Sequence, residues 1–187
     1  MPPNVVRSQD YTKAKQLLSE AGHPDGLTVT LSAPNFIDMP QYAQLVQQQC
    51  RPAGITVKIE SVDYNAWYSG GPNDAPWLNA NFGIVEWGPR PTPAVYSQFM
   101  LLPTSAWSSS HWDNKEFTST FDQYMSTTDE AKRMEYATKL SAIQQDDTPI
   151  VVAFFITQLR AMKKTVFGVV GPGSWYCYVD RAFIATA

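Results

Sequence analysis

The residues best suited to chemistry in this chain lie close together at Glu86, Trp87, Gly88 and Arg90. The Trp87 ring offers a broad apolar face on which a sugar ring or an apolar side chain can stack. The Arg90 guanidinium is always charged, and its fork of donors suits a carboxylate, a phosphate or a polyhydroxylated ligand. Glu86 supplies a carboxylate that could pair with Arg90 or reach for a hydroxyl. These residue types indicate a binding site.

The surrounding segment predicts where these side chains lie. Residues 82–85 form a short apolar run of strand type, which predicts a buried strand. Three prolines between residues 89 and 93 then prevent a helix or a sheet ladder, because proline lacks a backbone N–H and has a fixed φ. Open α/β sheets place ligands beyond the carboxyl ends of their strands. We therefore expect Trp87 and Arg90 at a binding edge.

An enzyme would need a constellation of residues that this sequence does not supply. His111 follows three serines, but adjacent residues seldom face each other productively, and no orienting acid is evident. Asp146 and Asp147 end a predicted helix, so we expect both carboxylates to lie in solvent and to take no part in catalysis. No Gly-x-Ser-x-Gly segment and no spaced set of His, Cys or Asp ligands occurs. We expect no enzyme, no cofactor and no metal; the enzymatic alternative is a small hydrolase that uses His111.

The composition of the chain limits the classes of protein to which it can belong. The 187 residues are 44% hydrophobic, enough for one compact core, and the net charge of −3 with no basic cluster argues against a nucleic-acid partner. The longest apolar run, residues 150–156, is too short to cross a bilayer.

Residues 1–10 resemble an interior linker, so we expect any export signal upstream. Cys50 and Cys177 fit either two small buried side chains or a disulfide, and the sequence leaves that choice open.

Helix and strand signals alternate through the first half of the chain, which predicts an α/β fold. Helices are indicated by apolar residues at helical spacing between a capping residue and a glycine or proline, and strands by apolar residues in alternation. The predicted elements are a helix from Asp10 to Gly22, a strand from Leu27 to Leu31, a helix from Asp38 to Cys50, a strand from Ile55 to Ile59 and a short helix capped by Asp63.

The second half predicts mainly helices. A helix covers residues 94–102, and another begins at Asp113 or Asn114 and places Phe117, Phe121 and Tyr124 on one face. A capping box from Thr127 to Glu130 is expected to begin the longest helix. The continuous apolar run from Pro149 to Ile156 predicts a central strand that is covered on both faces. Residues 165–170 and 175–179 are typical of strand or loop.

Several ordered blocks of this sequence resemble the family 5 extracellular solute-binding proteins, the oligopeptide, dipeptide and nickel receptors of ABC importers. In that family a run of the form D-x-x-K-A-K-x-L-L-x-E-A-G-Y-P-D-G opens the second large lobe, and residues 11–26 match it closely. The resemblance spans nearly the whole chain from Tyr11 onward. It continues through Ala53–Val57, Val62–Trp67, Trp87–Gly88, Asn114–Gln145 and Asp147–Ile150.

The resemblance implies that the chain is the C-terminal lobe of a larger, two-lobed receptor. Residues 11–187 would form a single α/β ligand-binding lobe of the type II periplasmic binding protein fold, a three-layer unit with a mixed sheet flanked by helices. The receptor would be periplasmic or on the cell surface, act as a monomer, enclose a peptide, oligosaccharide or related solute, and deliver it to a membrane permease. The alternative is a stand-alone protein-interaction or adhesive module without a transport role.

This sequence departs from the family at the ligand site. Peptide-binding members place an Asp three residues after the Trp, where it pairs with the free α-amino group of the peptide, and Arg90 occupies that position here. A guanidinium repels an ammonium and attracts a carboxylate, a phosphate or a hydroxyl. Glu86 replaces a residue that is usually small. With Tyr64 and Trp67, which suit stacking, and with Trp87 and Gly88, these residues complete the predicted ligand site.

Overall fold

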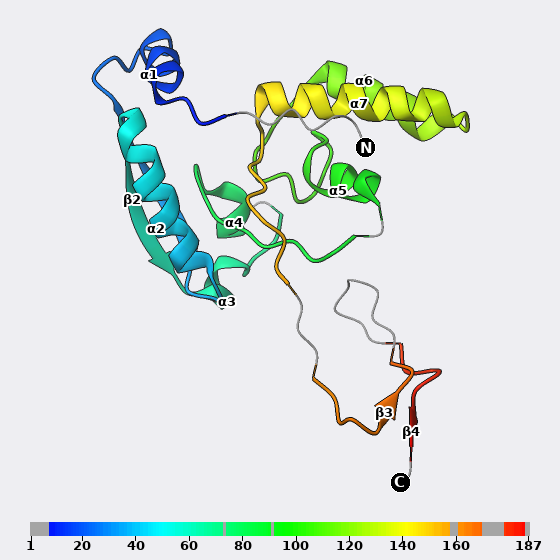
Figure 1. Cartoon of the computed structure of the whole chain (residues 1–187). Coiled ribbons are helices and arrows are strands. Elements are labelled where there is room, and N and C mark those ends of the chain that lie inside the picture. The colour runs from blue at the N-terminus through cyan, green and yellow to red at the C-terminus, as the bar shows by residue number, and fades with distance from the viewer. Residues whose placement is uncertain (1–7, 73, 91, 158–160, 170–177, 186–187) are drawn as a thin grey trace.

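The computed structural model of this chain describes residues 8–72, 74–90, 92–157, 161–169 and 178–185. Figure 1 shows strands and helices together in the first half of the chain and helices in most of the second. The predicted α/β class is therefore confirmed. The elements are α1 (Tyr11–Glu20), β1 (Leu27–Pro34), α2 (Met39–Cys50), the 3-10 helix η1 (Arg51–Ala53), β2 (Ile55–Val62), α3 (Tyr64–Trp67), α4 (Pro76–Asn79), α5 (Pro93–Met100), α6 (Lys115–Ser126), α7 (Glu130–Asp147), β3 (Val166–Phe167) and β4 (Phe183–Ile184).

β1 and β2 form a parallel pair whose register runs from Leu27 opposite Ile55 to Pro34 opposite Val62. The turn before β1 requires a glycine at position 26, because its φ is 99° and an added Cβ would lie 2.5 Å from the carbonyl oxygen of Gly54. The backbone N–H of Leu27 donates to that same carbonyl at 3.0 Å, which begins the pairing. Local turn chemistry therefore sets the register of the sheet.

Helix α2 lies along this sheet and closes the first core (Figure 1). Its apolar residues Met39 and Ala43 are buried, as the spacing predicts. They meet side chains from both strands, since alternate strand residues point to the same face. The buried members of this core are Leu31, Ala33, Met39, Ala43, Val57 and Ile84.

The predicted strand at residues 82–85 is reduced to a single parallel bridge between Ser32 and Gly83. The backbone N–H of Ser32 donates to the carbonyl of Phe82, and the N–H of Ile84 donates to the carbonyl of Ser32, each at 3.0 Å. Ile84 is buried but Phe82 is 40% exposed, so only part of the apolar run reaches the core. The pairing stops after this bridge, before the proline-rich loop begins.

The second core lies under α6 and α7, which run side by side (Figure 1). Asn114 begins α6, because its side-chain oxygen accepts a hydrogen bond from the N–H of Phe117 at 2.8 Å. Phe117 is 1% exposed and packs with Met100 and Leu101. The predicted capping box is wrong: Asp129 caps α7, since its carboxylate accepts from the N–H of Lys132 at 2.8 Å.

The prediction of a covered central strand at residues 149–156 is also wrong. This run is extended without strand pairing in the part of the chain that the structure describes, and Val151 and Phe155 are 73% and 87% exposed. Ile150 packs on the second core, and the ring centre of Phe154 lies 5.7 Å from that of Tyr42. A continuous apolar run predicts a strand buried on both faces, but Val152, at 63%, is exposed like Val151 and Phe155.

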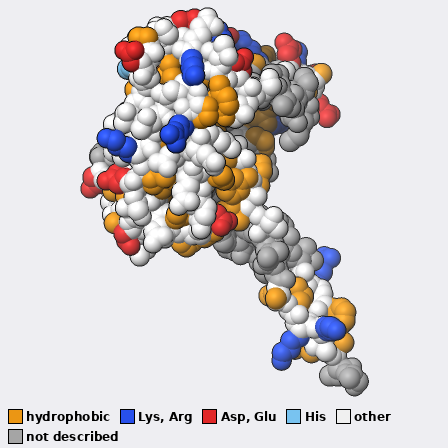
Figure 2. Space-filling view, turned by 60° about the vertical axis from the view of Figure 1, so that its left-hand side comes forward, with side chains coloured by type: hydrophobic (Ala, Val, Ile, Leu, Met, Phe, Trp, Pro, Cys, Tyr) orange, Lys and Arg blue, Asp and Glu red, His pale blue; other side chains and the backbone are white. Residues whose placement is uncertain are grey.

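Parallel and antiparallel pairing occur in separate sheets among the described residues. β3 and β4 form an antiparallel pair, with Val166 opposite Ile184 and Phe167 opposite Phe183. Figure 1 places this pair apart from the body of the chain, and Figure 2 shows exposed hydrophobic side chains on the arm that carries it. Most of the linker predicted at residues 1–10 lies outside the described residues. Cys50 is half-buried, and Cys177 lies outside the described residues, so the choice between a disulfide and two buried side chains stays open.

Candidate functional site

Three chain segments leave the sheet at the same edge, and each carries an aromatic side chain. The two strands β1 and β2 are parallel, and the bridge at Gly83 runs parallel to β1, so their carboxyl ends meet. Phe36 follows β1, Tyr64 follows β2, and Trp87 follows the bridge. This is the position where open α/β sheets bind ligands. Trp87 thus follows the bridge at the edge where β1 and β2 end.

The aromatic side chains at this edge form a continuous series, which we call the aromatic row. The distance between the centroids of neighbouring rings ranges from 4.1 Å, between Phe36 and Tyr64, to 6.4 Å, between Trp87 and either Trp77 or Tyr96. Most contacts are tilted or edge-to-face, the arrangement that aromatic quadrupoles favour. The members of the row are Phe36, Tyr64, Tyr68, Trp77, Trp87, Tyr96, Phe99 and Trp107.

Arg90 is built into the row. Its guanidinium carbon lies 5.8 Å from the centre of the Trp87 ring and 5.9 Å from that of Phe99, so it makes cation–π contacts with both. The Tyr96 hydroxyl fixes the loop, because it accepts from the Arg90 backbone N–H at 3.1 Å and donates to the carbonyl of Gly88 at 3.3 Å. Arg90 is half-buried, and its place is set by aromatic rings.

Glu86 reaches a hydroxyl of the protein, and it forms no ion pair with Arg90 in the part of the chain that the structure describes. Tyr64 donates its hydroxyl hydrogen to Oε1 of Glu86 at 2.6 Å. The backbone N–H of Glu86 donates to the Tyr68 hydroxyl at 3.1 Å. Oε2 of Glu86 is buried and has no hydrogen-bond partner among the described residues. Glu86 therefore holds two tyrosines of the row in place.

The bond to Glu86 raises the pKa of Tyr64 to about 12, and burial adds to this effect. Burial also raises the pKa of Tyr68. The pKa of Tyr64 is higher in the folded chain than its ordinary value of 10.0. The bond to Glu86 therefore contributes fully to the free energy of unfolding below pH 10.0, and this contribution is lost as the pH rises towards 12. Tyr64 thus remains a neutral hydroxyl at physiological pH.

We expect Tyr64 to remain largely protonated at about pH 11, where an ordinary tyrosine is largely ionised. The measurement is the pH titration of the tyrosine ring-carbon NMR signals, with Tyr64→Phe used to assign the signal. In Glu86→Gln the pKa of Tyr64 should fall towards 10.0, because the charged acceptor is removed. Ionisation of Tyr64 near pH 10 in the folded wild-type chain would show that the bond to Glu86 does not form.

Trp67 lies behind the site and is 2% exposed, whereas the sequence analysis placed it among the ligand-binding residues. Its ring fills the space beside Gly83, where an added Cβ would come within 2.8 Å of the Trp67 ring. The short helix α3 that carries it is capped by Asp63, whose carboxylate accepts from the N–H of Ala66 at 2.9 Å. In this structure Trp67 contacts protein atoms and supports the bridge to β1.

Six of the eight members of the row were not among the predicted site residues. Phe36 could have been identified, since it follows a predicted strand as Tyr64 does. The sequence analysis did not place Trp77 and Trp107 in the site, because nothing local shows that they meet Trp87 at 6.4 Å and 5.9 Å. The six missed residues are Phe36, Tyr68, Trp77, Tyr96, Phe99 and Trp107.

The hydrolase alternative finds no nucleophile and base pair among the described residues. Nε2 of His111 lies 2.9 Å from the carbonyl oxygen of Leu78, and since a carbonyl only accepts, the ring nitrogen donates to it. The hydroxyl groups of Ser108 and Ser110 are buried without a hydrogen-bond partner, so neither is bonded to His111. The same part of the chain contains no group of three or more His, Cys, Asp or Glu that could hold a metal ion.

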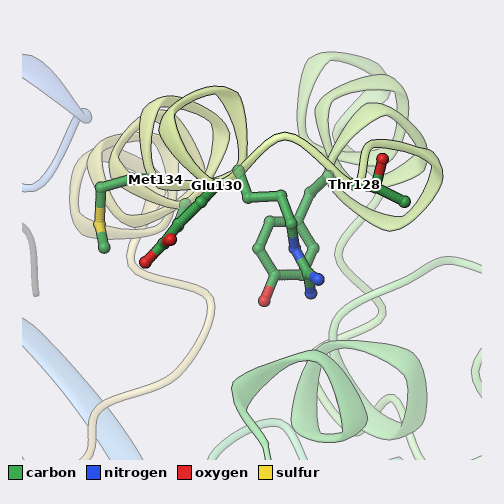
Figure 3. Close-up of a pocket in the computed structure, with 6 residues that line it drawn as sticks. Thr128, Glu130 and Met134 are labelled. Carbon is green, nitrogen blue, oxygen red and sulfur yellow. The ribbon is translucent and has the colours of Figure 1, made fainter.

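Two open hollows lie along α7, away from the row. The first, of about 270 Å³, is lined by Tyr124, Thr128, Glu130, Arg133, Met134 and Ala137 (Figure 3). In this hollow the guanidinium carbon of Arg133 lies over the Tyr124 ring, 5.0 Å from its centre. The second, of about 450 Å³, is lined by side chains of α7 and of residues 148–152. Neither contains a member of the aromatic row.

Sequence comparison assigns most of the chain to one family. The family of bacterial extracellular solute-binding proteins, family 5 Middle, matches residues 2–110. The glutathione-binding protein GsiB of Salmonella paratyphi A is 30% identical over 128 residues, which cover 52% of this chain and 25% of that protein. None of the helices that the structure describes is long and apolar enough to cross a membrane.

Solved structures share the fold. The clavulanic acid biosynthesis oligopeptide binding protein 2 superposes with a TM-score of 0.78 at 18% identity, covering 95% of this chain and 34% of that one. The protein MoaA of A. tumefacien R10, in complex with mannopinic acid, superposes with a TM-score of 0.55 at 29% identity, covering 70% of this chain and 27% of that one. This chain thus spans between 25% and 34% of the length of these three proteins.

These neighbours have the type II periplasmic binding protein fold, which confirms the expected fold family. The family match covers more than half of the chain and extends through the aromatic row as far as Trp107. Its members are solute-binding proteins of ABC importers rather than enzymes. This chain belongs to the family 5 bacterial extracellular solute-binding proteins.

Proposed function

We propose that this chain is the C-terminal lobe of a two-lobed ABC-importer receptor and that the aromatic row forms its half of the ligand cleft. One observation carries this proposal: a series of eight aromatic rings begins at the carboxyl edge of the sheet, and the centres of two of them, Trp87 and Phe99, lie 5.8 Å and 5.9 Å from the Arg90 guanidinium carbon. Such a surface offers large stacking area at small entropic cost, together with one charged donor group.

The solute is a peptide, an oligosaccharide or a related compound with an anionic or hydroxyl group. Similar proteins are named for glutathione and oligopeptides, and one was solved with mannopinic acid. Glutathione and mannopinic acid both carry carboxylates. A carboxylate suits the bidentate fork of Arg90, whereas the free amine of an ordinary peptide would be repelled there.

Each predicted site residue has a role in this proposal. Trp87 and Tyr64 stack against the solute, and Arg90 binds its acidic or hydroxyl group. The Gly88 carbonyl is engaged by Tyr96 and keeps the loop in position. Glu86 and Trp67 act on the solute through their neighbours, since their functional atoms are bonded or buried.

In the organism the receptor would work outside the cytoplasm, in the periplasm or at the cell surface. It would act as a monomer that closes on its solute and presents it to a membrane permease, and residues 1–10 would link the two lobes. No covalent step follows from the site, so the protein would bind and release its solute unchanged.

Replacing Arg90 with alanine should weaken binding of a carboxylated solute by tenfold or more, about 1.4 kcal/mol, because a charge-assisted bidentate contact is lost. The measurement is isothermal titration of the two-lobed receptor with glutathione and with mannopinic acid. Arg133→Ala is the matched control, since Arg133 also stacks on an aromatic ring but lies on α7, outside the row. An affinity within about twofold of wild type in Arg90→Ala would reject the role given to this residue.

A further inference from the structure

The loop from Glu86 to Arg90 keeps its shape without pairing to the sheet. Within the described part of the chain, no backbone N–H of residues 85–90 donates to another backbone group, and Pro89 has no N–H to donate. These residues are nevertheless half-buried, and backbone groups that are shielded from water need hydrogen-bond partners. The partners of these groups therefore decide where Trp87 and Arg90 lie.

A tyrosine hydroxyl holds each end of this loop. At the start, the N–H of Glu86 donates to the Tyr68 hydroxyl at 3.1 Å. At the end, the N–H of Arg90 donates to the Tyr96 hydroxyl at 3.1 Å, and that hydroxyl donates to the carbonyl of Gly88 at 3.3 Å. A phenol hydroxyl can both accept and donate, so one oxygen atom of Tyr96 binds two backbone groups of the loop. Trp87 lies between the two points of attachment.

The two tyrosines belong to different parts of the fold. Tyr68 ends α3, which follows the sheet, whereas Tyr96 lies in α5, near α6 and α7 (Figure 1). The Tyr68 ring packs at 5.1 Å from the ring of Tyr64, and the Tyr96 ring packs on the second core. Because the rings are held by these contacts, each hydroxyl is presented to the loop from a fixed place. The loop is thus attached to the sheet at one end and to the helical part at the other.

We propose that Tyr68 and Tyr96 are positioning residues, whose hydroxyl groups form a clamp that holds Trp87 and Arg90 in the arrangement that receives the solute. The proline-rich loop cannot be held by a strand ladder, and the two hydroxyls take the place of that ladder. Side chains that are held in their bound arrangement lose less conformational entropy when the solute binds. This inference rests on the proposed function, and it assigns no solute contact to either hydroxyl.

Native-state hydrogen exchange of the 187-residue chain tests the clamp without a solute. Tyr96→Phe and Tyr68→Phe each remove one hydroxyl and keep the ring. The N–H of Arg90 should exchange about fivefold faster in Tyr96→Phe, and that of Glu86 about fivefold faster in Tyr68→Phe, because each loses one hydrogen bond.

Two controls separate a local effect from a general loss of stability. The N–H of Phe117, which donates to the side chain of Asn114 at the start of α6, should keep its exchange rate in both variants. Tyr124→Phe is the matched control variant, since it removes a hydroxyl from a ring that stacks on Phe121 in α6. It should leave the exchange of Arg90 and Glu86 unchanged.

Solute binding then tests the positioning role. Isothermal titration of the two-lobed receptor with glutathione and with mannopinic acid should show an affinity about threefold to tenfold lower in Tyr68→Phe and in Tyr96→Phe than in wild type. Tyr124→Phe should bind both probes as wild type does. A hydroxyl with only a structural role would speed the exchange of Phe117 together with that of Arg90, and it would leave the affinity of the folded receptor unchanged.

The proposal is overturned if Arg90 and Glu86 exchange in wild type as fast as unprotected amides, because the two bonds then do not form. It is overturned as well if the exchange of Phe117 rises to the same extent, or if a probe binds wild type and both variants with equal affinity. If no solute binds the wild-type receptor, the proposed function fails, whereas the exchange rates still decide whether the clamp exists.

Discussion

Replacing Trp87 with alanine should weaken solute binding by about 30-fold or more, the largest loss expected from any single change in the aromatic row. Its ring contacts Trp77, Tyr96 and Trp107, so the substitution opens the centre of the row. Buried aromatic anchors at the centre of a contact commonly contribute about 2 kcal/mol or more to binding, which corresponds to about 30-fold in affinity. The measurement is isothermal titration of the two-lobed receptor with its tightest-binding solute.

Trp87 also packs against the second core, so the folded state of each variant must be checked by its melting temperature. Trp87→Phe keeps an aromatic face and should retain much of the affinity, whereas Trp87→Leu keeps apolar volume and loses the stacking face. Equal affinity in wild type and Trp87→Leu would contradict a stacking role for this residue.

Replacing Phe117 with alanine should lower the free energy of unfolding by about 3–5 kcal/mol, because it leaves a cavity in a packed core. Phe117 is 1% exposed, and its ring lies 4.7 Å from that of Trp112. Phe155→Ala is the matched control, because it makes the same chemical change at a side chain that is 87% exposed. It should alter stability by about 0.5 kcal/mol or less.

Urea unfolding of the 187-residue chain measures the change in the free energy of unfolding for Phe117→Ala and for Phe155→Ala. If both variants lose the same free energy of unfolding, the result would contradict the structure and support the buried strand predicted at residues 149–156. A small loss in Phe117→Ala would instead show that the core beneath α6 and α7 is not closely packed. This comparison therefore tests the largest difference between the fold expected from the sequence and the fold observed.

Local signals made the helices and the first two strands predictable. Asp10 and Asn114 cap α1 and α6 with side-chain bonds of 2.8 Å, and these bonds depend only on residues three positions apart. Alternation from Leu27 and from Ile55 identified β1 and β2, since Leu27–Leu31 and Ile55–Ile59 each alternate between less exposed and more exposed residues. The start of α7 was misplaced because Thr127 and Asp129 are both good caps, and the carboxylate of Asp129 makes the bond.

Features that depend on distant residues could not be predicted. The apolar run after Pro149 shows which residues tend to be buried, but its sequence does not state what covers it. The predicted site at Trp87 and Arg90 follows from a strand end and a proline-rich loop, which are local. The contact between Glu86 and Tyr64, 22 residues apart, depends on parallel strand ends meeting at one edge. Of the two partners that the sequence left open for Glu86, Arg90 or a hydroxyl, the described residues show a hydroxyl, that of Tyr64.

The most direct test of the aromatic row is the NMR spectrum of the tryptophan indole N–H groups in the 187-residue chain during titration with carboxylated solutes. Signals of Trp77, Trp87 and Trp107 should shift together with one affinity, while those of Trp67 and Trp112, which lie behind the row and in the second core, should stay in place. A half-site of millimolar affinity would be saturated at about 100 mM solute. No shift of Trp87 at that concentration, or a shift confined to Trp112, would contradict the site.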